Sequence, residues 1–439
     1  MVQRDFAYMV WGVDDETHQI VGTTFSPYKK AKGNQELISW LIGMLSDNAR
    51  FEFQSVAING KDVVVLIVSA AQLYPVAFQN DAFIRSGSCT KLLAKELSLQ
   101  SRLWDCLRNE RFEMATALKD LTGDEVEEKL NIAAYFDGIG QKVPEKQAER
   151  LKYLEKENII HKQDNKWFSI INFGAVLLAQ NLRDFPSVSR KEIRVVQYSG
   201  DSRGAPMERD RSFEQGYAVC ATQLVEYVDA LLPSREPIAS TGLREVHRAY
   251  PPSAVRELLI NAMIHQDLTS TGNCVTCEIF TDRVEITNPG DLLIEKERIV
   301  DLPPISRNAL LARVMRRMRL CEELGTDWDK VAESCEQMLL PAPTINQREH
   351  AVKTVLYSGV DFFELSREQK LWACYLHACV RKMQEKSVTN GTLRERFGLG
   401  PENSASISRL LGDAVKANLL KVKDEGAGRR SKQYLPYWA

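Results

Sequence analysis

Residues 256–267 read RELLINAMIHQD, in which Glu257, Asn261 and His265 recur at intervals of four. This spacing predicts an amphipathic helix that carries the three polar side chains on one face. An amide oxygen can ligate Mg²⁺, and a carboxylate one turn earlier can orient or deprotonate a water, so the pattern suits phosphoryl chemistry. For the helix alone, a solvated polar face is the default interpretation. The opposite face, which we expect to pack on a sheet, is apolar: Leu258, Leu259, Ala262 and Met263.

The segments that follow this helix come in a characteristic order. DRVEITNPGD (282–291) joins a strand pattern to an Asn-Pro-Gly turn, where glycine lets the backbone approach a ligand closely. Next come a polar loop with SRNALLARVMRRM (306–318) and then ELGTDWDKV (323–331), with a single glycine at a helix start. Helix, strand, glycine turn, loop and second glycine turn in this order resemble the GHKL ATP-binding fold. The closer resemblance is to the ATPase-like domain at the C-terminal side of RecG-like ATP-binding proteins.

This resemblance implies ATP and Mg²⁺ as cofactors and gives roles to the matching residues. Asn261 would hold Mg²⁺, and Glu257 would be the catalytic, water-activating residue. The remaining cofactor-binding positions implied are these: His265 on the same helix, Asn288 and Gly290 beside the adenine, Arg307 and Asn308 in the lid, and Gly325 at the second glycine box.

Three departures from the family pattern affect the expected activity. Asn288 stands where the family offers an aspartate to the adenine amine, so that hydrogen bond lacks charge assistance. Gly325-Thr326-Asp327 replaces a turn with two glycines and puts a carboxylate near the phosphates. Gln266 stands where relatives tend to carry arginine. We therefore expect nucleotide binding with at most weak ATPase activity.

The resemblance extends over nearly the whole chain. WGVDDETHQIVGTTF (11–25), the strand DVVVLIV and FIRSGSCTK (83–91) are similar to the Schlafen AlbA-type nucleic-acid-binding domain. TNGTLRERFGLGPENSASISRLLGDAVKANLLK (389–421) resembles the winged helix that ends this architecture. Together with alternating strands and amphipathic helices, this predicts a multidomain α/β protein with winged helices. The four expected parts are a truncated Schlafen AlbA-like α/β domain (1–110), a winged-helix-like domain (111–185), a GHKL-like α/β sandwich (186–362) and a basic C-terminal winged helix (363–439).

The second of these parts depends on a predicted hairpin. ENIIHKQ and KWFSIIN flank Asp164-Asn165, a turn-forming pair that would make the tip of a wing. A small linking domain that uses the same shape only for packing is an equally weighted alternative.

Charge distribution indicates nucleic acid as a partner. The net charge is −2, yet residues 366–439 hold 14 Lys and Arg against 7 Asp and Glu. A basic module on a nearly neutral chain is typical of phosphate contact, with a dimerisation module as the alternative. The expected nucleic-acid-binding residues are Arg394, Arg396 and Arg409 around a helix-turn-helix pattern with Asn403 or Ser404 as N-cap, Arg429, Arg430 and Lys432 in a basic wing, and Arg85 and Lys91 in the N-terminal domain.

Three functions compete on this reading. The first is an ATP-gated, DNA- or RNA-binding regulator in transcription or defence. The second is a metal-dependent nuclease of Schlafen type, for which Asp14, Asp15 and Glu16 are the available carboxylates. The third is a structural subunit with a degenerate ATPase fold. A helicase is excluded because the chain contains no G-x-x-x-x-G-K-[ST] phosphate loop.

Remaining features predict a cytoplasmic protein. No apolar run is long enough to span a bilayer, and the start MVQRDFAYMVWGV lacks the basic region of a signal peptide. The nine cysteines indicate reduced thiols, and Cys274 and Cys277 form a lone CxxC in a predicted strand, for which buried thiols are a better interpretation than a metal site. By its resemblance the chain is expected to form a homodimer.

Overall fold

The computed structural model divides into two compact units, Met1–Phe112 and Glu113–Ala439, and helix α2 (Leu97–Met114) spans the division. Both units mix helices with sheets, which confirms the predicted multidomain α/β class. The residues that the structure describes are 6–32, 35–71, 74–86, 89–163, 166–235, 247–302, 305–321, 327–424, 426, 428 and 432–439.

The first unit contains a three-stranded antiparallel sheet in the order β1-β5-β4. Its strand β5 contains the predicted strand DVVVLIV. Trp11 at the end of β1 stacks on Phe25 with ring centroids 4.5 Å apart. The elements of this unit before α2 are β1 (Phe6–Trp11), β2 (Lys30–Lys32), β3 (Gln35–Glu36), α1 (Leu37–Met44), β4 (Phe51–Ile58), β5 (Lys61–Ser69), β6 (Ala77–Phe78), β7 (Asp81–Ser86) and β8 (Cys89–Leu92).

The second unit begins with a small sheet in the order β10-β11-β9. The predicted hairpin is confirmed, since Ile160 pairs with Ile170 and Lys162 with Phe168, and its tip, Asp164-Asn165, lies outside the described residues. Strand β9 was not predicted from the sequence. The elements are β9 (Thr116–Leu121), α3 (Gly123–Lys129), α4 (Ile132–Gly138), α5 (Gln147–Lys156), β10 (Ile160–Lys162), β11 (Phe168–Ile171) and α6 (Asn172–Leu178).

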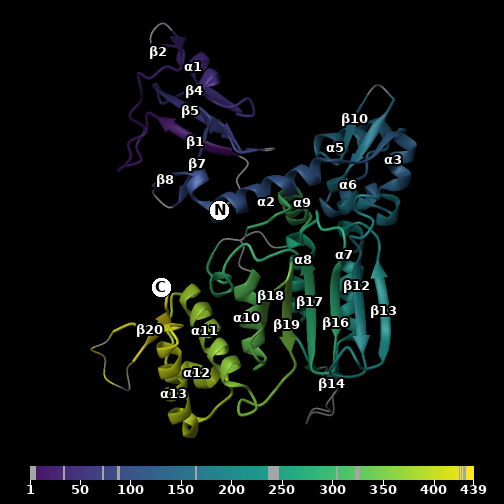
Figure 1. Ribbon diagram of the computed structural model, residues 1–439, viewed down its shortest axis with the longest axis vertical. Coiled ribbons are helices and arrows are strands. Elements are labelled where there is room, and N and C mark those ends of the chain that lie inside the picture. Colours follow the sequence, from purple (N-terminus) through teal and green to yellow (C-terminus); the bar gives the residue numbers. More distant parts are fainter. Residues whose placement is uncertain are drawn as a thin grey trace. The chain divides into compact units, whose positions relative to one another are not determined.

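A six-stranded sheet forms the centre of the second unit, in the order β13-β12-β16-β17-β19-β18 (Figure 1). β12 and β16 run parallel and all other neighbours are antiparallel. β-Branched residues favour its strands, and because side chains alternate along a strand, one face of the sheet points toward the helices. The strands are β12 (Ile193–Tyr198), β13 (Met207–Phe213), β16 (Val275–Ile279), β17 (Arg283–Pro289), β18 (Thr344–Arg348) and β19 (Ala351–Tyr357).

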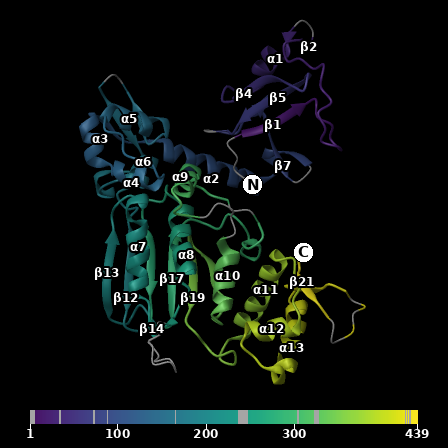
Figure 2. The same ribbon diagram turned by 180° about the vertical axis from the view of Figure 1, so that it is seen from behind.

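Helices α7 (Tyr217–Leu231), α8 (Pro252–His265) and α10 (Asp327–Gln337) lie over one face of this sheet (Figure 2). α8 covers residues 256–265 of the helix predicted for 256–267 and ends before Gln266 and Asp267. It starts with a proline in its first turn, where the missing amide hydrogen costs nothing. Leu259 and Met263 of α8 are fully buried, so the predicted apolar face is confirmed at these two positions. A further short helix, α9 (Ala309–Arg317), follows the segment after β17.

The C-terminal part of the second unit has three helices followed by a two-stranded hairpin. Ser366 and Gln369 form a capping box that starts α11, and α10 packs on α11. Asn403 is the N-cap of α13, as predicted, but its side chain makes no capping hydrogen bond. The elements are α11 (Arg367–Met383), α12 (Asn390–Arg396), α13 (Ser404–Lys416), β20 (Leu420–Val422) and β21 (Tyr434–Pro436).

Of the CxxC pair, Cys277 lies in a strand as predicted, whereas Cys274 precedes that strand by one residue. Cys277 is buried in β16, and burial raises the pKa of its thiol to about 12. Within the described ranges, no group of three or more His, Cys, Asp or Glu side chains is arranged to hold a metal ion. In the same part of the chain, no helix combines the length and the apolar character needed to cross a membrane.

Candidate functional site

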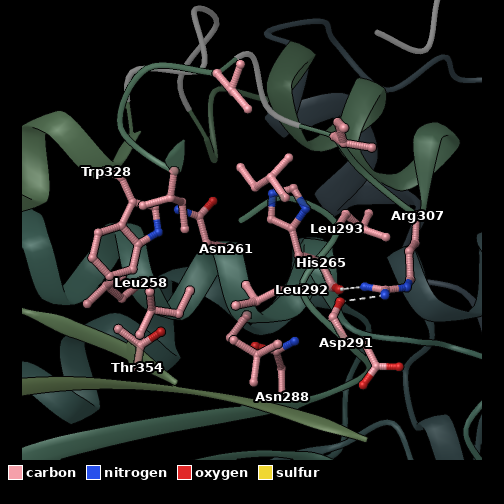
Figure 3. Close-up of a pocket in the computed structure, with 17 residues that line it drawn as sticks. Leu258, Asn261, His265, Asn288, Asp291, Leu292, Leu293, Arg307, Trp328 and Thr354 are labelled. Carbon is pink, nitrogen blue, oxygen red and sulfur yellow. Dashed lines mark hydrogen bonds between the residues drawn. The ribbon is translucent and has the colours of Figure 1, made fainter. Parts of the chain in front are cut away.

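A pocket in the second unit lies between α8, the strands β17 to β19, the segment 291–302 with Ile305, and the first turn of α10 (Figure 3). It encloses about 810 Å³ of empty space, part of it open to solvent. Its walls are mainly apolar with a few polar groups. The lining residues are Leu258, Asn261, Ala262, His265, Asn288, Asp291, Leu292, Leu293, Ile294, Ile299, Leu302, Ile305, Arg307, Trp328, Ile345, Val352 and Thr354.

α8 presents Asn261 and His265 to this pocket, but not Glu257. Residues four apart on a helix are offset by about 40°, so three such residues spread over about 80°. The face that meets the pocket is centred between His265 and Leu258, and Glu257 falls about 90° from that centre. Glu257 is 8% exposed and lies outside the wall. Leu258 and Ala262, which were predicted to pack on the sheet, line the pocket instead.

The predicted glycine turn lies at the mouth of the same pocket. Gly290 has a φ of +110°, and a Cβ atom there would lie 3.1 Å from the Cβ of Asp267. Its amide donates to the carbonyl of His350 at 2.8 Å, and the amide of Asp267 donates to the carbonyl of Pro289 at 2.8 Å. Glycine is therefore required here both for the backbone conformation and for the close approach of the segment after α8.

Asn288 contributes a directed polar group to the pocket wall. The side chain is 8% exposed, and its amide nitrogen donates to the carbonyl of Pro289 at 3.3 Å. The amide oxygen of Asn288 is an acceptor that a ligand in the pocket could use.

Arg307 and Asn308, predicted to lie in a lid over the nucleotide, have different positions. Arg307 lines the pocket and donates to the carbonyls of His265 at 3.4 Å and Asp291 at 2.5 Å (Figure 3). Asn308 is fully buried, and its amide nitrogen donates to the carbonyls of Ile264 and Gln266, both at 2.8 Å. The last carbonyls of a helix need such partners, so Asn308 caps α8 and is not a ligand-contacting residue.

His265 is a neutral wall residue. Its burial, with the nearby charge of Arg307, lowers the pKa of its imidazole to about 4. The neighbouring Gln266 is fully buried and donates to the hydroxyl of Tyr217 at 2.7 Å, so this departure from the family pattern lies behind the pocket wall.

Sequence reasoning missed the aromatic wall of the pocket. Trp328, in the first turn of α10, is 8% exposed and lines the pocket. Its position three residues after Gly325 was the available signal, because the turn before this helix was expected to meet the ligand. Gly325 itself lies outside the described residues. The apolar residues of 292–305 and Thr354 on β19 were also missed, since their approach to α8 depends on tertiary packing.

The basic residues predicted in the C-terminal part are not all available to a partner. Arg396 is 5% exposed, donates to the carbonyl of Leu340 at 2.8 Å and places its Nε 3.3 Å from the Glu336 carboxylate. It was wrongly placed among the nucleic-acid-binding residues, because its guanidinium is used inside the fold. Arg394 is half-buried and donates to Asn390 at 3.0 Å, whereas Arg409 on α13 is exposed.

The predicted wing is only partly described. Lys432 is half-buried before β21, and Arg429 and Arg430 lie outside the described residues.

Arg85 and Lys91 lie on paired strands but on opposite faces of the β7–β8 hairpin. Ile84 is the cross-strand partner of Lys91, and Arg85 is the partner of Thr90. Cross-strand partners share a face and successive residues alternate, so the two cations do not form one phosphate site. Lys91 also pairs with Glu96 at 2.8 Å.

The acidic turn of the first unit has a local structural role. Asp14 accepts hydrogen bonds from the backbone amide and hydroxyl of Thr17 at 2.8 and 2.7 Å. These bonds hold the pKa of the Asp14 carboxyl below its usual value. Aspartate commonly stabilises a turn in this way, by accepting hydrogen bonds from groups a few residues further along the chain.

Comparison with known proteins identifies two domains in the predicted order. Residues 4–94 match the family described as "Schlafen, AlbA_2". Residues 272–356 match the family described as "Putative ATP-dependent DNA helicase recG C-terminal". The chain therefore contains a Schlafen AlbA_2 domain followed by an ATPase-like domain of the RecG C-terminal type, as the resemblance implied. The second match includes Asn288 and Gly290 and starts after α8, so it does not include Asn261.

Solved structures similar to this chain include one of a whole protein from a bacterium. The DIP2311 protein from Corynebacterium diphtheriae aligns at 16% identity over 98% of this chain and 82% of that chain, with a TM-score of 0.48. No curated protein matches this chain.

Proposed function

We propose that this chain, in which a Schlafen AlbA_2 domain precedes an ATPase-like domain of the RecG C-terminal type, is a nucleic-acid-binding regulator that takes an adenine nucleotide in the pocket beneath α8. Nucleotide occupancy would control the arrangement of its nucleic-acid-binding modules. The observation that carries the proposal is the acceptor oxygen of Asn288 at the wall of an apolar pocket beside Gly290.

The described pocket suits the base of the nucleotide. Trp328, Leu258 and Val352 supply flat or apolar surface against which an aromatic base can pack. The Asn288 oxygen can accept from the exocyclic amine of adenine. Guanine has a carbonyl at that position, and two facing acceptors repel each other, so the pocket should prefer adenine over guanine.

The residues present support metal binding only together with the nucleotide. Asn261 would hold Mg²⁺ through its amide oxygen, with phosphate oxygens and waters completing the shell, as is usual for Mg²⁺. Because Glu257 lies outside the pocket wall, the described residues favour binding over rapid hydrolysis. We therefore propose that the nucleotide acts as a bound switch with slow turnover.

The C-terminal part would supply one nucleic-acid-binding module. Its helices α11 to α13 and the hairpin β20–β21 follow the order of a winged helix, and Arg409 is exposed on α13. We propose that α13 is the helix that contacts the groove. A homodimer and a cytoplasmic location remain predictions.

Thermal unfolding tests nucleotide binding by the full chain. A ligand at about 100 times its dissociation constant stabilises the native state by about 2.7 kcal/mol, so Mg-ATP should raise the Tm by about 5 °C, and Mg-GTP by much less. Asn261→Ala should abolish the part of the shift that depends on Mg²⁺.

The matched control for this variant is Asn346→Ala, an exposed asparagine on β18 outside the pocket. It should respond to Mg-ATP as the parent does. If millimolar ATP leaves every Tm unchanged, the proposal fails, and a structural subunit with a degenerate ATPase fold becomes the better account.

A further inference from the structure

The surface of α9 carries an uninterrupted group of arginines. The exposed residues between 305 and 320 are all arginine, and we call them the arginine ridge: Arg313, Arg316, Arg317 and Arg319. The sequence contains no Asp or Glu between Asp301 and Glu322. This surface was not among the basic sites predicted from the sequence, and it lies outside both the Schlafen AlbA_2 domain and the C-terminal helices.

Contacts at both ends fix the ridge against α8. Asn308, just before α9, bonds the final carbonyls of α8, and Arg256 on α8 donates to the carbonyls of Arg319 and Leu320 at 3.3 and 3.2 Å. Glu113 accepts from the amides of Leu310 and Leu311 at 3.2 and 2.9 Å, which occupies the start of α9. The ridge is therefore a preformed surface on the ATPase-like domain.

An acidic side chain partly neutralises this surface at Arg317. Glu157 pairs with Arg317 at 2.8 Å, and Arg317 also donates to the hydroxyl of Tyr135. Arg316 and Arg319 lie on the exposed side of the last turn and just beyond it. Cations near the C-terminal end of a helix interact favourably with the negative end of the helix dipole, and this accounts for a preference for positive charge there. The helix dipole does not explain why every exposed residue between 305 and 320 is an arginine.

We propose that the arginine ridge binds the phosphate backbone of a nucleic acid. Guanidinium groups match phosphate oxygens with paired hydrogen bonds, and Arg keeps its charge at every physiological pH. The ridge exposes no large apolar side chain that could anchor a protein partner. Phosphate contacts carry no sequence information, so the ridge would contribute affinity and register to recognition by other modules.

The ridge lies close enough to the candidate nucleotide pocket to act on one of its wall residues. Arg307 lines the pocket six residues before Arg313, and the charge of Arg316 contributes to lowering the pKa of His265. The inference itself does not depend on nucleotide binding, and its test is made without nucleotide.

The test is the salt dependence of nucleic-acid binding by the full chain. Fluorescence anisotropy would be measured with labelled duplex DNA, single-stranded DNA and single-stranded RNA between about 50 and 200 mM salt. For the preferred nucleic acid, Arg316→Gln/Arg319→Gln should raise the Kd about 10-fold at the lower salt concentration and reduce the slope of log K against log salt by about 2.

Two further variants distinguish nucleic-acid binding at the ridge from the effect of a changed net charge. Arg190→Gln/Arg209→Gln removes the same charge from exposed positions before β12 and on edge strand β13, and it should keep the parent slope. Arg316→Lys/Arg319→Lys keeps the charge and should retain most of the affinity. Equal Kd values and slopes for the ridge and control glutamine variants would overturn the proposal, as would failure of the parent to bind any of the three nucleic acids.

Discussion

Replacing Asn288 by leucine should weaken the binding of Mg-ATP by about 10- to 100-fold. The substitution keeps a side chain of similar size in the pocket wall and removes the amide oxygen, which on this account leaves the adenine amine without a partner. Leaving one buried polar group unsatisfied costs about 1–3 kcal/mol, and 1.4 kcal/mol corresponds to a tenfold change in Kd. Calorimetric titration of the full chain with Mg-ATP measures the effect.

Asn288→Asp is the informative companion variant. It restores the carboxylate of the family pattern, so the hydrogen bond becomes charge-assisted and ATP should bind at least as tightly as to the parent. The preference for ATP over GTP should be lost in Asn288→Leu and retained in Asn288→Asp. Equal ATP affinities for the parent and Asn288→Leu would show that this side chain does not contact the base.

Replacing Arg396 by alanine should lower the free energy of unfolding by about 3–5 kcal/mol. Arg396 and His377 are 5% and 6% exposed, and both meet the Glu336 carboxylate, His377 through its Nδ1 at 2.9 Å. Removing the guanidinium takes a positive charge away from the half-buried Glu336 carboxylate. It also removes the hydrogen-bond donor to the Leu340 carbonyl. Urea denaturation followed by tryptophan fluorescence would record the change.

Arg394→Ala is the matched control, since Arg394 lies on the same helix and is half-buried. Its loss should cost about 1 kcal/mol or less. Glu336→Ala/Arg396→Ala should be less destabilised than the sum of the two single variants, because the partners interact directly. Indistinguishable stabilities of Arg396→Ala and Arg394→Ala would contradict the buried ion pair.

Sequence periodicity predicted the elements of the pocket better than its side chains. The helix at α8, the strand β17 and the turn at Gly290 were all predicted, because each depends on local patterns of apolar residues and glycine. Glu257 was misplaced because a four-residue interval was treated as a constant direction on the helix, whereas 3.6 residues per turn make it drift.

The burial of polar residues was harder to predict than the elements. Asn308 and Arg396 each bond carbonyls of segments distant in sequence, and composition gives no sign of such contacts. One signal for Arg396 was available, since residues two apart on a helix do not face the same way, so Arg394 and Arg396 could not both contact one groove. The arginine ridge could also have been predicted from the sequence. The stretch between Asp301 and Glu322 contains five arginines, four of them in the ridge, and no Asp or Glu.

The most direct test of nucleotide binding is a structure of the full chain with a nonhydrolysable ATP analogue and Mg²⁺. We predict the adenine between Trp328 and α8 with its amine at the Asn288 oxygen, and the metal at the Asn261 amide. An analogue bound elsewhere, or the pocket filled only by solvent at millimolar analogue, would contradict this account.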